Sequence, residues 1–277
     1  MDAHDATRSR TRTFLSAEWR YLAMLNYPID PEALRPFTPL GTELDLWQGE
    51  AFVSLVGFLF LDARVMGLPI PFHRNFEEVN LRFYVRRRAQ SEWRRGVVFV
   101  KEFVPRRAIA AIARTLYNEN YVAASMAHSI DSSGGFLRPN GSVEYTWTAQ
   151  GAGGRISVTT SGEAAQPPED SHEGFIAEHY WGYARQRNGG TREYRVEHPP
   201  WKVWASKSAE FEGDIASLYG ERFVECLSPP PKSAFLADGS AITVGMGLKV
   251  LEESSGAYVK TEPVKGIEPT VSLTGRD

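Results

Sequence analysis

Cysteine is almost absent from this chain, and that scarcity limits the setting in which the protein works. A single cysteine, Cys226, in 277 residues excludes an internal disulfide and fits a reducing compartment. The first residues, MDAHDATRSRTRTF, contain no apolar segment typical of a secretory signal. The most apolar run, residues 51–61, is about half the ~20 residues that a membrane-spanning helix needs. We therefore expect a cytoplasmic protein with no membrane partner.

An excess of charge of one sign is also missing. The formal net charge is −3 and the isoelectric point is about 6.1. Long-range electrostatics thus gives no reason to expect nucleic acid as a partner. The basic runs at residues 86–88 and 94–95 flank one hairpin turn, and we interpret them as a solvated hairpin tip. Apolar residues make up 42% of the chain, which is enough for a sizeable core in one or two domains.

The composition divides the chain into three parts. Residues 1–13 are polar and rich in Arg and Thr, and we expect a disordered lead-in. Residues 249–277 are rich in Glu, Ser, Thr, Pro and Gly with few aromatics, which predicts a disordered tail. Residues 14–248 are expected to form a single folded domain.

Most of the folded part has strand-like patterns. Residues 18–27 predict a strand that is halted by Pro28. Asp30 and Pro31 then have the types of an N-cap and a first helical residue. Residues 51–61 are apolar almost throughout, as in a strand covered on both faces, and Gly57 within them indicates a bulge or a close backbone approach. Further strands are expected at residues 121–130, 142–147, 155–160, 191–196, 201–211, 220–227 and 235–244.

The clearest alternation lies at residues 78–85. Val79, Leu81, Phe83 and Val85 alternate with Glu78, Asn80, Arg82 and Tyr84, which is the period of a β-strand. The partner strand, VVFVKEFV, follows Gly96. At residues 106–117 the apolar spacing changes to that of an amphipathic helix.

Several motifs occur in consistent order: EWRYLAMLNYPIDPEALRPF, GTELDLWQGEAFVSLVGFLF, FEEVNLRFYV, ARTLYNENY, FIAEHYWGY and TREYRVEHPPW. In these motifs, over residues 14–245, the chain resembles the bacterial YqjF-like proteins of unknown function, the DUF2071 family. That family is grouped with the acetoacetate decarboxylase-like superfamily. The resemblance implies a mainly β (α+β) fold: a mostly antiparallel, partly open β-barrel with a few helices packed outside and a ligand cavity within.

The resemblance does not carry over the decarboxylase chemistry. Acetoacetate decarboxylases form a Schiff base on a lysine in a Gly-Phe-Pro-Lys-Lys-like segment, whereas residues 115–119 here read TLYNE. Neither Tyr nor Asn can supply the amine. Lys101, the nearest strand lysine, points away from the face of Glu102 and is expected to reach solvent. Glu78 resembles the strand glutamate that lines the superfamily's pocket.

Two interpretations of the polar face of residues 78–84 stay open. In the first, Glu78, Asn80, Arg82 and Tyr84 line a barrel lumen, where Arg82 holds a substrate carboxylate and Glu78 acts as acid or base. In the second, the same face is an ordinary solvated strand surface. At the end of the predicted helix, similarly, Arg114, Tyr117, Asn118 and Glu119 form either the mouth of the pocket or a helix C-cap with salt bridges.

Four further residues complete the candidate site. Tyr121, like Tyr117, could donate a hydrogen bond, and Arg114 is an alternative anion clamp. Glu178 and His179 belong to a pocket wall with Trp181 or to a buried hydrogen-bonded patch. His198 sits in a His-Pro-Pro-Trp segment that either fixes it toward a carboxylate or is a structural corner. His172 and His179 are seven residues apart, which is not the spacing of a helical zinc pair.

The leading hypothesis is a protein with an internal polar pocket that binds a small organic acid or carbonyl compound. If the protein is an enzyme, we expect a lyase or isomerase that works by proton transfer without imine chemistry. The alternative is a non-catalytic small-molecule-binding or structural β-barrel; a transferase-like or lipid-handling barrel ranks last. We expect no cofactor and no metal, and a homodimer only because closed dimers are the commonest oligomers.

Overall fold

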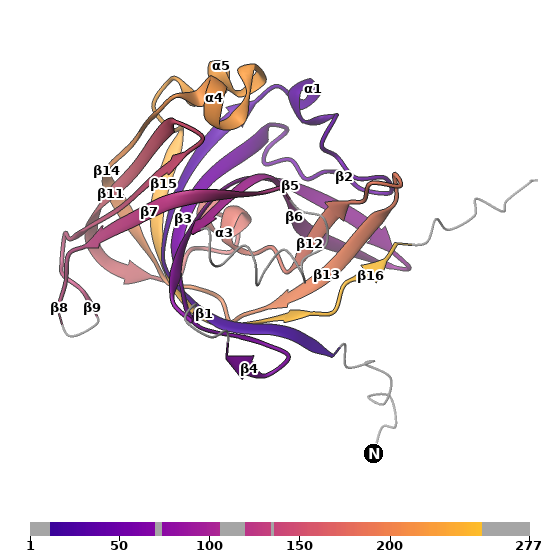
Figure 1. The fold of residues 1–277 in the computed structure, drawn as a ribbon, viewed down its shortest axis with the longest axis horizontal. Helices are drawn as coiled ribbons and strands as arrows, with labels where there is room; N and C mark the ends of the chain where they lie inside the picture. Colours follow the sequence, from indigo (N-terminus) through magenta and orange to yellow (C-terminus); the bar gives the residue numbers. More distant parts are fainter. Residues whose placement is uncertain (1–11, 70–73, 106–119, 134–135, 251–277) are drawn as a thin grey trace, which may run out of the picture.

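The computed structural model describes residues 12–69, 74–105, 120–133 and 136–250. Most of these residues are in strands (Figure 1). The strands are β1 Thr13–Ile29, β2 Glu43–Leu44, β3 Ala51–Val65, β4 Leu68–Pro69, β5 Phe76–Ala89, β6 Glu92–Pro105, β7 Tyr121–Ile130, β8 Ser132–Ser133, β9 Phe136–Leu137, β10 Ser142–Ala149, β11 Ala152–Ala165, β12 Trp181–Arg185, β13 Thr191–Glu197, β14 Val203–Gly213, β15 Ser233–Gly245 and β16 Leu248–Lys249. The helices are α1 Pro31–Leu34, α3 His172–Ala177, α4 Ile215–Tyr219 and α5 Val224–Leu227, with a 3₁₀ turn η1 at Glu221–Phe223.

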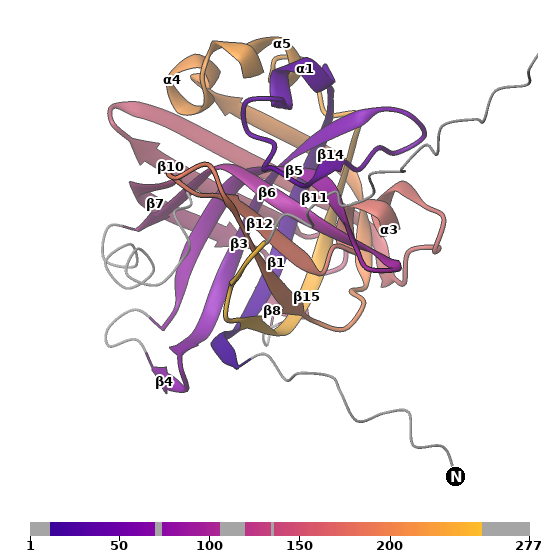
Figure 2. The same cartoon turned by 90° about the vertical axis from the view of Figure 1, so that its right-hand side faces the viewer.

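Fourteen of these strands form one sheet, which curls into a partly ring-like form (Figures 1 and 2). Its order is β16-β13-β12-β6-β7-β10-β11-β14-β15-β1-β3-β5-β2, with β4 paired to β3. The pairings are antiparallel except where β6 meets β7 and β12. The predicted fold class, mainly β with a mostly antiparallel sheet, is confirmed.

Two additional pairings, β6 with β5 and β13 with β15, join strands that are distant in this order. With them, the sheet contains two closed rings of hydrogen-bonded strands, which we call circuits. The two circuits share β15, β1, β3, β5 and β6. One circuit runs on through β7, β10, β11 and β14, and the other through β12 and β13. Strands shared by two circuits have an interior on each face, which explains why the first ten residues of β3 are all buried.

The alternation along β5 separates two clusters of buried residues. Val79, Leu81, Phe83 and Val85 pack in a cluster with β10 and β11. Tyr84 packs on the opposite face, in a second cluster that includes β13 and the segment around Trp201. Period-two patterning therefore predicted the two faces of β5 correctly, but both of them face the interior.

Local sequence signals account for the start of α1 and for Gly57. The Asp30 carboxylate accepts a hydrogen bond from the Glu32 backbone N–H at 3.0 Å, and Pro31 is the first helical residue. A Cβ placed on Gly57 would lie 2.6 Å from atoms of both Ile156 and Tyr145. Gly57 is thus a point of close approach, made by two side chains and not by another backbone, and the register of β1 and β3 shifts between Arg20 and Ala23, which lies opposite Gly57.

One expected boundary and one expected strand are wrong. β1 does not stop at Pro28 but continues to Ile29, with Pro28 opposite Phe52 of β3. The pairing of β1 with β15 ends at Asn26, so the missing N–H of Pro28 removes no bond on that side. Residues 220–227, expected as a strand, form η1 and α5 instead. Phe223 and Leu227 are both buried, at the i, i+4 spacing of one helical face.

The regular structure begins and ends close to the expected limits of the folded part. Thr13 already belongs to β1, and Lys249 ends β16. The helix expected at residues 106–117 lies outside the described residues. None of the helices that the structure describes is long and apolar enough to cross a membrane.

Candidate functional site

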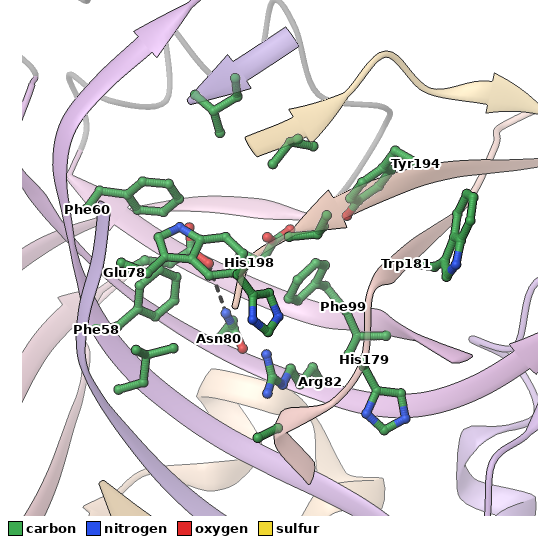
Figure 3. Close-up of a pocket in the computed structure, with 18 of the residues that line it drawn as sticks. Phe58, Phe60, Glu78, Asn80, Arg82, Phe99, His179, Trp181, Tyr194 and His198 are labelled. Carbon is green, nitrogen blue, oxygen red and sulfur yellow. Dashed lines mark hydrogen bonds between the residues drawn. The ribbon is translucent and has the colours of Figure 1, made fainter. Parts of the chain in front are cut away.

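One pocket opens inside the circuit that contains β12 and β13 (Figure 3). Its walls come from β1, β3, β5, β6, β12, β13, β15 and the end of α3, with Tyr121 of β7, and the cavity volume is about 60 Å³. Most of the lining is apolar or aromatic. The apolar members are Leu15, Trp19, Leu22, Phe58, Phe60, Val97, Phe99, Ala177, Trp181, Tyr194, Val196, Trp201 and Val244.

A row of polar side chains on β5 forms one wall of the pocket. Glu78, Asn80 and Arg82 are 3%, 1% and 8% exposed and point to the same side of the strand. The Asn80 amide donates to a Glu78 carboxylate oxygen at 2.9 Å. Figure 3 shows the three side chains following one another along the strand.

A second buried carboxylate, Glu102, lies beside this row on the neighbouring strand β6. It lies opposite Asn80 in the register of β5 and β6, is 1% exposed and lines the pocket. Glu102 was not among the predicted site residues. The signal that could have found it is an acidic residue within the apolar run VVFVKEFV, on the face opposite Lys101.

Arg82 is a buried cation without a carboxylate partner in the described part of the chain. No Asp or Glu oxygen there lies within 4.0 Å of its guanidinium, and its Nε has no hydrogen-bond partner among those residues. Its Nη2 lies 3.9 Å from the Met24 sulfur, and its guanidinium carbon is 5.8 Å from the centre of the Tyr84 ring. A guanidinium removed from water in this way costs free energy unless an anion approaches it.

Unlike Arg82, three arginines at the hairpin of β5 and β6 have carboxylate partners. Arg87 and Arg94 both bind the Glu193 carboxylate, at 3.2 and 2.6 Å. Arg95 binds Asp45 at 2.6 Å. The expectation of a solvated tip is therefore wrong for these three arginines, because their acidic partners come from β13 and from the segment after β2.

His179 forms the end of the pocket wall next to Arg82. Its side chain is 2% exposed, and its Nε2 lies 3.3 Å from the Asp45 carboxylate. Burial lowers the pKa of His179 to about 4, although the hydrogen bond with Asp45 opposes the shift. Burial alone would raise the pKa of Asp45, but the hydrogen bonds from His179 and Arg95 hold it below its ordinary value. At neutral pH the pair is a neutral imidazole next to a carboxylate.

His198 lines the pocket and is held by aromatic stacking. Its ring is 4.7 Å from Tyr180 and 4.1 Å from Trp201, and its Nδ1 is 2.9 Å from the carbonyl of Pro199. Burial lowers the pKa of His198 below its ordinary value. The His-Pro-Pro-Trp segment thus acts as a structural corner that also contributes to the pocket lining.

Two predicted pocket residues lie beside the cavity and do not line it. The Tyr84 hydroxyl is 2.5 Å from Ser54 Oγ, which donates to Asn26 at 2.6 Å. Glu178 accepts a hydrogen bond from the Tyr180 hydroxyl. Both therefore support the wall from behind.

The remaining predicted site residues, Arg114, Tyr117, Asn118 and Glu119, lie outside the described residues. Lys101 is half-buried and does not extend freely into solvent, because its ammonium donates to the Leu218 carbonyl in α4. Burial lowers the pKa of Lys101. No lysine is among the described residues that line the pocket.

Within the described ranges, no three His, Cys, Asp or Glu residues gather as a metal site.

Comparisons with known proteins agree with this architecture. Residues 16–241 match the sequence model of DUF2071, described as an uncharacterized conserved protein. The uncharacterized protein YqjF of Bacillus subtilis (strain 168) is 27% identical over 201 residues, which cover 72% of this chain and 78% of that protein.

Solved structures with a similar fold are enzymes of distant sequence. An acetoacetate decarboxylase-like enzyme from Sphingomonas wittichii RW1 superposes with a TM-score of 0.61 at 14% identity, covering 90% of this chain and 99% of that one. The enduracididine biosynthesis enzyme MppR complexed with pyruvate gives 0.60 at 14% identity, covering 88% and 93%. Acetoacetate decarboxylase from Legionella pneumophila gives 0.59 at 13% identity, covering 90% and 93%. At these identities the similarity establishes the fold alone.

Proposed function

Since the chain belongs to the DUF2071 family of uncharacterized conserved proteins and has an acetoacetate decarboxylase-like fold, we propose that its pocket binds a small organic acid through Arg82. The observation that carries the proposal is the buried guanidinium of Arg82, which has no carboxylate within 4.0 Å in the described part of the chain. A carboxylate can engage a guanidinium through two parallel hydrogen bonds, which match its charge and planar shape.

The other walls favour an acid with a compact apolar body. Phe58 and Phe60 line the side of the pocket away from the His179 end (Figure 3), and Trp19 and Phe99 also belong to the lining. Aromatic side chains of this kind stabilise apolar groups, while a few polar groups fix orientation. Pyruvate, with which the structural neighbour MppR is complexed, is the first acid to test because it is small and carries a carboxylate.

If chemistry occurs in the pocket, it is proton transfer and not imine formation. The absence of lysine among the described lining residues supports this, and the buried carboxyl groups Glu78 and Glu102 are candidate acids or bases. The reaction classes are then those of a lyase or isomerase. The competing interpretation is a protein that binds the acid without converting it.

Calorimetric titration with pyruvate tests the binding proposal. We expect the Arg82→Gln variant to bind about 10- to 100-fold more weakly, since a hydrogen bond to a charged group contributes about 1.5–3 kcal/mol. Arg88→Gln is the matched control, because Arg88 lies on the same strand but is exposed. Equal affinities of the wild type and Arg82→Gln would contradict the proposal.

Borohydride reduction tests the statement about imines. We expect no adduct on any lysine when the protein is treated with borohydride in the presence of pyruvate, as judged by mass spectrometry. A stable lysine adduct would overturn the exclusion of Schiff-base chemistry and leave binding by Arg82 untouched.

A further inference from the structure

Asp45 and His179 form a buried pair next to the pocket, and binding an acid through Arg82 does not by itself require such a pair. Asp45 follows β2 and His179 follows α3, so residues 134 positions apart in the chain meet inside the wall of the pocket. The Asp45 carboxylate is itself held by Arg95 Nε at 2.6 Å, and its backbone N–H donates to the Tyr84 carbonyl at 3.0 Å. The carboxylate is therefore fixed before any ligand arrives.

The imidazole of His179 is equally constrained. Its ring centre lies 4.6 Å from that of Tyr84 and 5.3 Å from that of Phe175, which meets it edge-on at 88°. A ring held between two aromatic side chains and a carboxylate has one orientation. Such preorganisation is what a reacting group needs, because misplacement by about 1 Å is costly.

The hydrogen bonds assign the proton of this imidazole. Nε2 lies 3.3 Å from Asp45 Oδ2, and a lone pair directed at a carboxylate oxygen would be repelled. We therefore place the proton on Nε2, which donates to Asp45, as the environment of the ring nitrogens usually decides the tautomer. The Nη2 of Arg95, 3.4 Å from the same nitrogen, can instead donate to the Phe175 carbonyl.

This assignment leaves a lone pair on Nδ1. The atom is buried and has no hydrogen-bond partner among the described residues. His179 lines the pocket, and Figure 3 shows Arg82 between Asn80 and His179. An acid whose carboxylate is bound by Arg82 would thus have a proton acceptor beside it.

Two other candidate bases, Glu78 and His198, fit the role less well. Glu78 already accepts the Asn80 amide at 2.9 Å. His198 directs Nδ1 at the Pro199 carbonyl and is stacked between two aromatic rings. No carboxylate of the described residues lies within 4.0 Å of its ring to stabilise an imidazolium, whereas Asp45 is in that position for His179.

We propose that His179 is the catalytic residue that removes a proton from the bound acid and that Asp45 is the positioning residue behind it. This inference rests on the proposed function, because Arg82 must first hold the carboxylate. The substrate class is a small 2-oxo acid with a hydrogen on C3. The C3–H bond breaks, the proton moves to Nδ1, the electron pair forms the C2–C3 double bond, and the negative charge moves to the oxo oxygen. Return of a proton to C3 restores the acid, so no co-reactant is consumed.

Hydrogen–deuterium exchange at C3 of pyruvate, followed by proton NMR in D₂O, tests this step. We expect the wild-type protein to accelerate the loss of the C3 signal over buffer alone. His179→Gln should slow the exchange about 100-fold, the lower range for a general base, with pyruvate affinity by calorimetry little changed. His128→Gln, which alters an exposed histidine outside the pocket, should exchange like the wild type.

Asp45→Asn separates positioning from simple support of the fold. Asp45 raises the pKa of His179, so loss of the carboxylate should lower that pKa and move the acidic limb of the exchange rate to lower pH. The rate itself should fall about 10-fold. A structural role alone would not shift the pH profile, and an unchanged profile contradicts the assignment of Asp45.

The outcomes distinguish this inference from the binding proposal. If pyruvate binds but the wild type does not accelerate exchange, or if His179→Gln exchanges like the wild type, the assignment of His179 is overturned and binding stands. If calorimetry detects no binding, both fall. Should His179→Gln not fold, nitrogen-15 NMR of the wild-type histidines decides, because a protonated Nδ1 in free His179 overturns the proposal.

Discussion

At the scale of the residue, burial decides the charge state of the pocket. His179 is removed from water and has a pKa of about 4, so it is neutral where an exposed histidine is partly protonated. Arg82 keeps its positive charge because a guanidinium does not lose its proton in proteins. The pocket therefore combines a permanent cation with a neutral proton acceptor, and the two need not compete for the same ligand group.

The depressed pKa of His179 makes the stability of the fold depend on pH. The unfolded chain takes up this proton near pH 6.5 and the folded chain only near pH 4, so acidification between these values favours unfolding. The loss from His179 amounts to at most about 3 kcal/mol in the free energy of unfolding. Burial also lowers the pKa of His172 and of His198, which adds to the trend with the same sign.

Urea unfolding at pH 7 and pH 4.5 measures this effect. We expect His179→Gln to be less sensitive to the pH change than the wild type, whereas His128→Gln should match the wild type. A His179→Gln variant as pH-sensitive as the wild type would show that the imidazole of His179 is not buried as described.

Single residues also show what the sequence could and could not predict about the site. Glu78, Asn80 and Arg82 were identified because ionisable and amide groups alternate with apolar ones on a single strand. Asp45 was not, because nothing local distinguishes a carboxylate near Gly49 from one on a surface loop. Its partners Arg95 and His179 come from β6 and from the segment after α3, and long-range proximity of this kind has no periodic signal.

At the scale of the element, β3 shows most clearly how the position of a strand in the fold explains its sequence pattern. It is shared by two circuits of the sheet, so neither face is exposed along most of its length. The nearly continuous apolar run at residues 51–61 is explained by this burial on both faces. The same crowding explains Gly57, where a side chain would meet Ile156 and Tyr145.

Gly57→Ala should therefore destabilise the protein. A Cβ there would lie 2.6 Å from Ile156 Cδ1 and from Tyr145 Cδ2, so both side chains would have to move. Overpacking of this kind costs about 1–3 kcal/mol in the free energy of unfolding. Gly153→Ala is the control, since the nearest atom to a Cβ at exposed Gly153 is 3.9 Å away. Chemical denaturation of both variants checks the difference, and equal stabilities would contradict the packing around Gly57.

The two wrong expectations, a strand at residues 220–227 and the end of β1 at Pro28, both came from local signals that neighbouring strands overrode. Residues 220–227 were expected to form a strand of the sheet, but their buried residues Phe223 and Leu227 follow helical spacing. Pro28 was expected to end β1, but a proline is tolerated where one neighbouring strand has already ended. In both cases a short apolar or proline signal was ambiguous until the neighbouring strands were known.

At the scale of the whole molecule, the two circuits of the sheet are not equally closed. In the circuit without the pocket, β10 and β11 pair along their full length, from Ser142 opposite Thr159 to Ala149 opposite Ala152. By contrast, β12 meets β6 only at Gly96 and Val97, and β13 meets β15 only at Val196 and Glu197. The circuit that contains the pocket is therefore joined by short contacts, while the other is filled by aliphatic and aromatic side chains.

Amide hydrogen exchange should reveal this asymmetry. Segments with few ladder bonds open with a smaller free energy than long paired strands. We expect the amides of β12 and β13 to exchange at least about 10-fold faster than those of β1 and β3, and to be slowed by pyruvate because both strands line the pocket. Uniformly slow exchange in all four strands would contradict the weaker pairing of β12 and β13.

The most direct measurement is a crystal structure of the protein grown with 2-oxobutanoate, which has the carboxylate and oxo groups of pyruvate with one more carbon. We expect the carboxylate oxygens about 3 Å from the Arg82 guanidinium nitrogens, with the alkyl end toward Phe58 and Phe60. A pocket in which the Arg82 guanidinium is instead bonded to a carboxylate of the protein, and the acid is bound elsewhere or not at all, would contradict the assignment of Arg82 as the anion site.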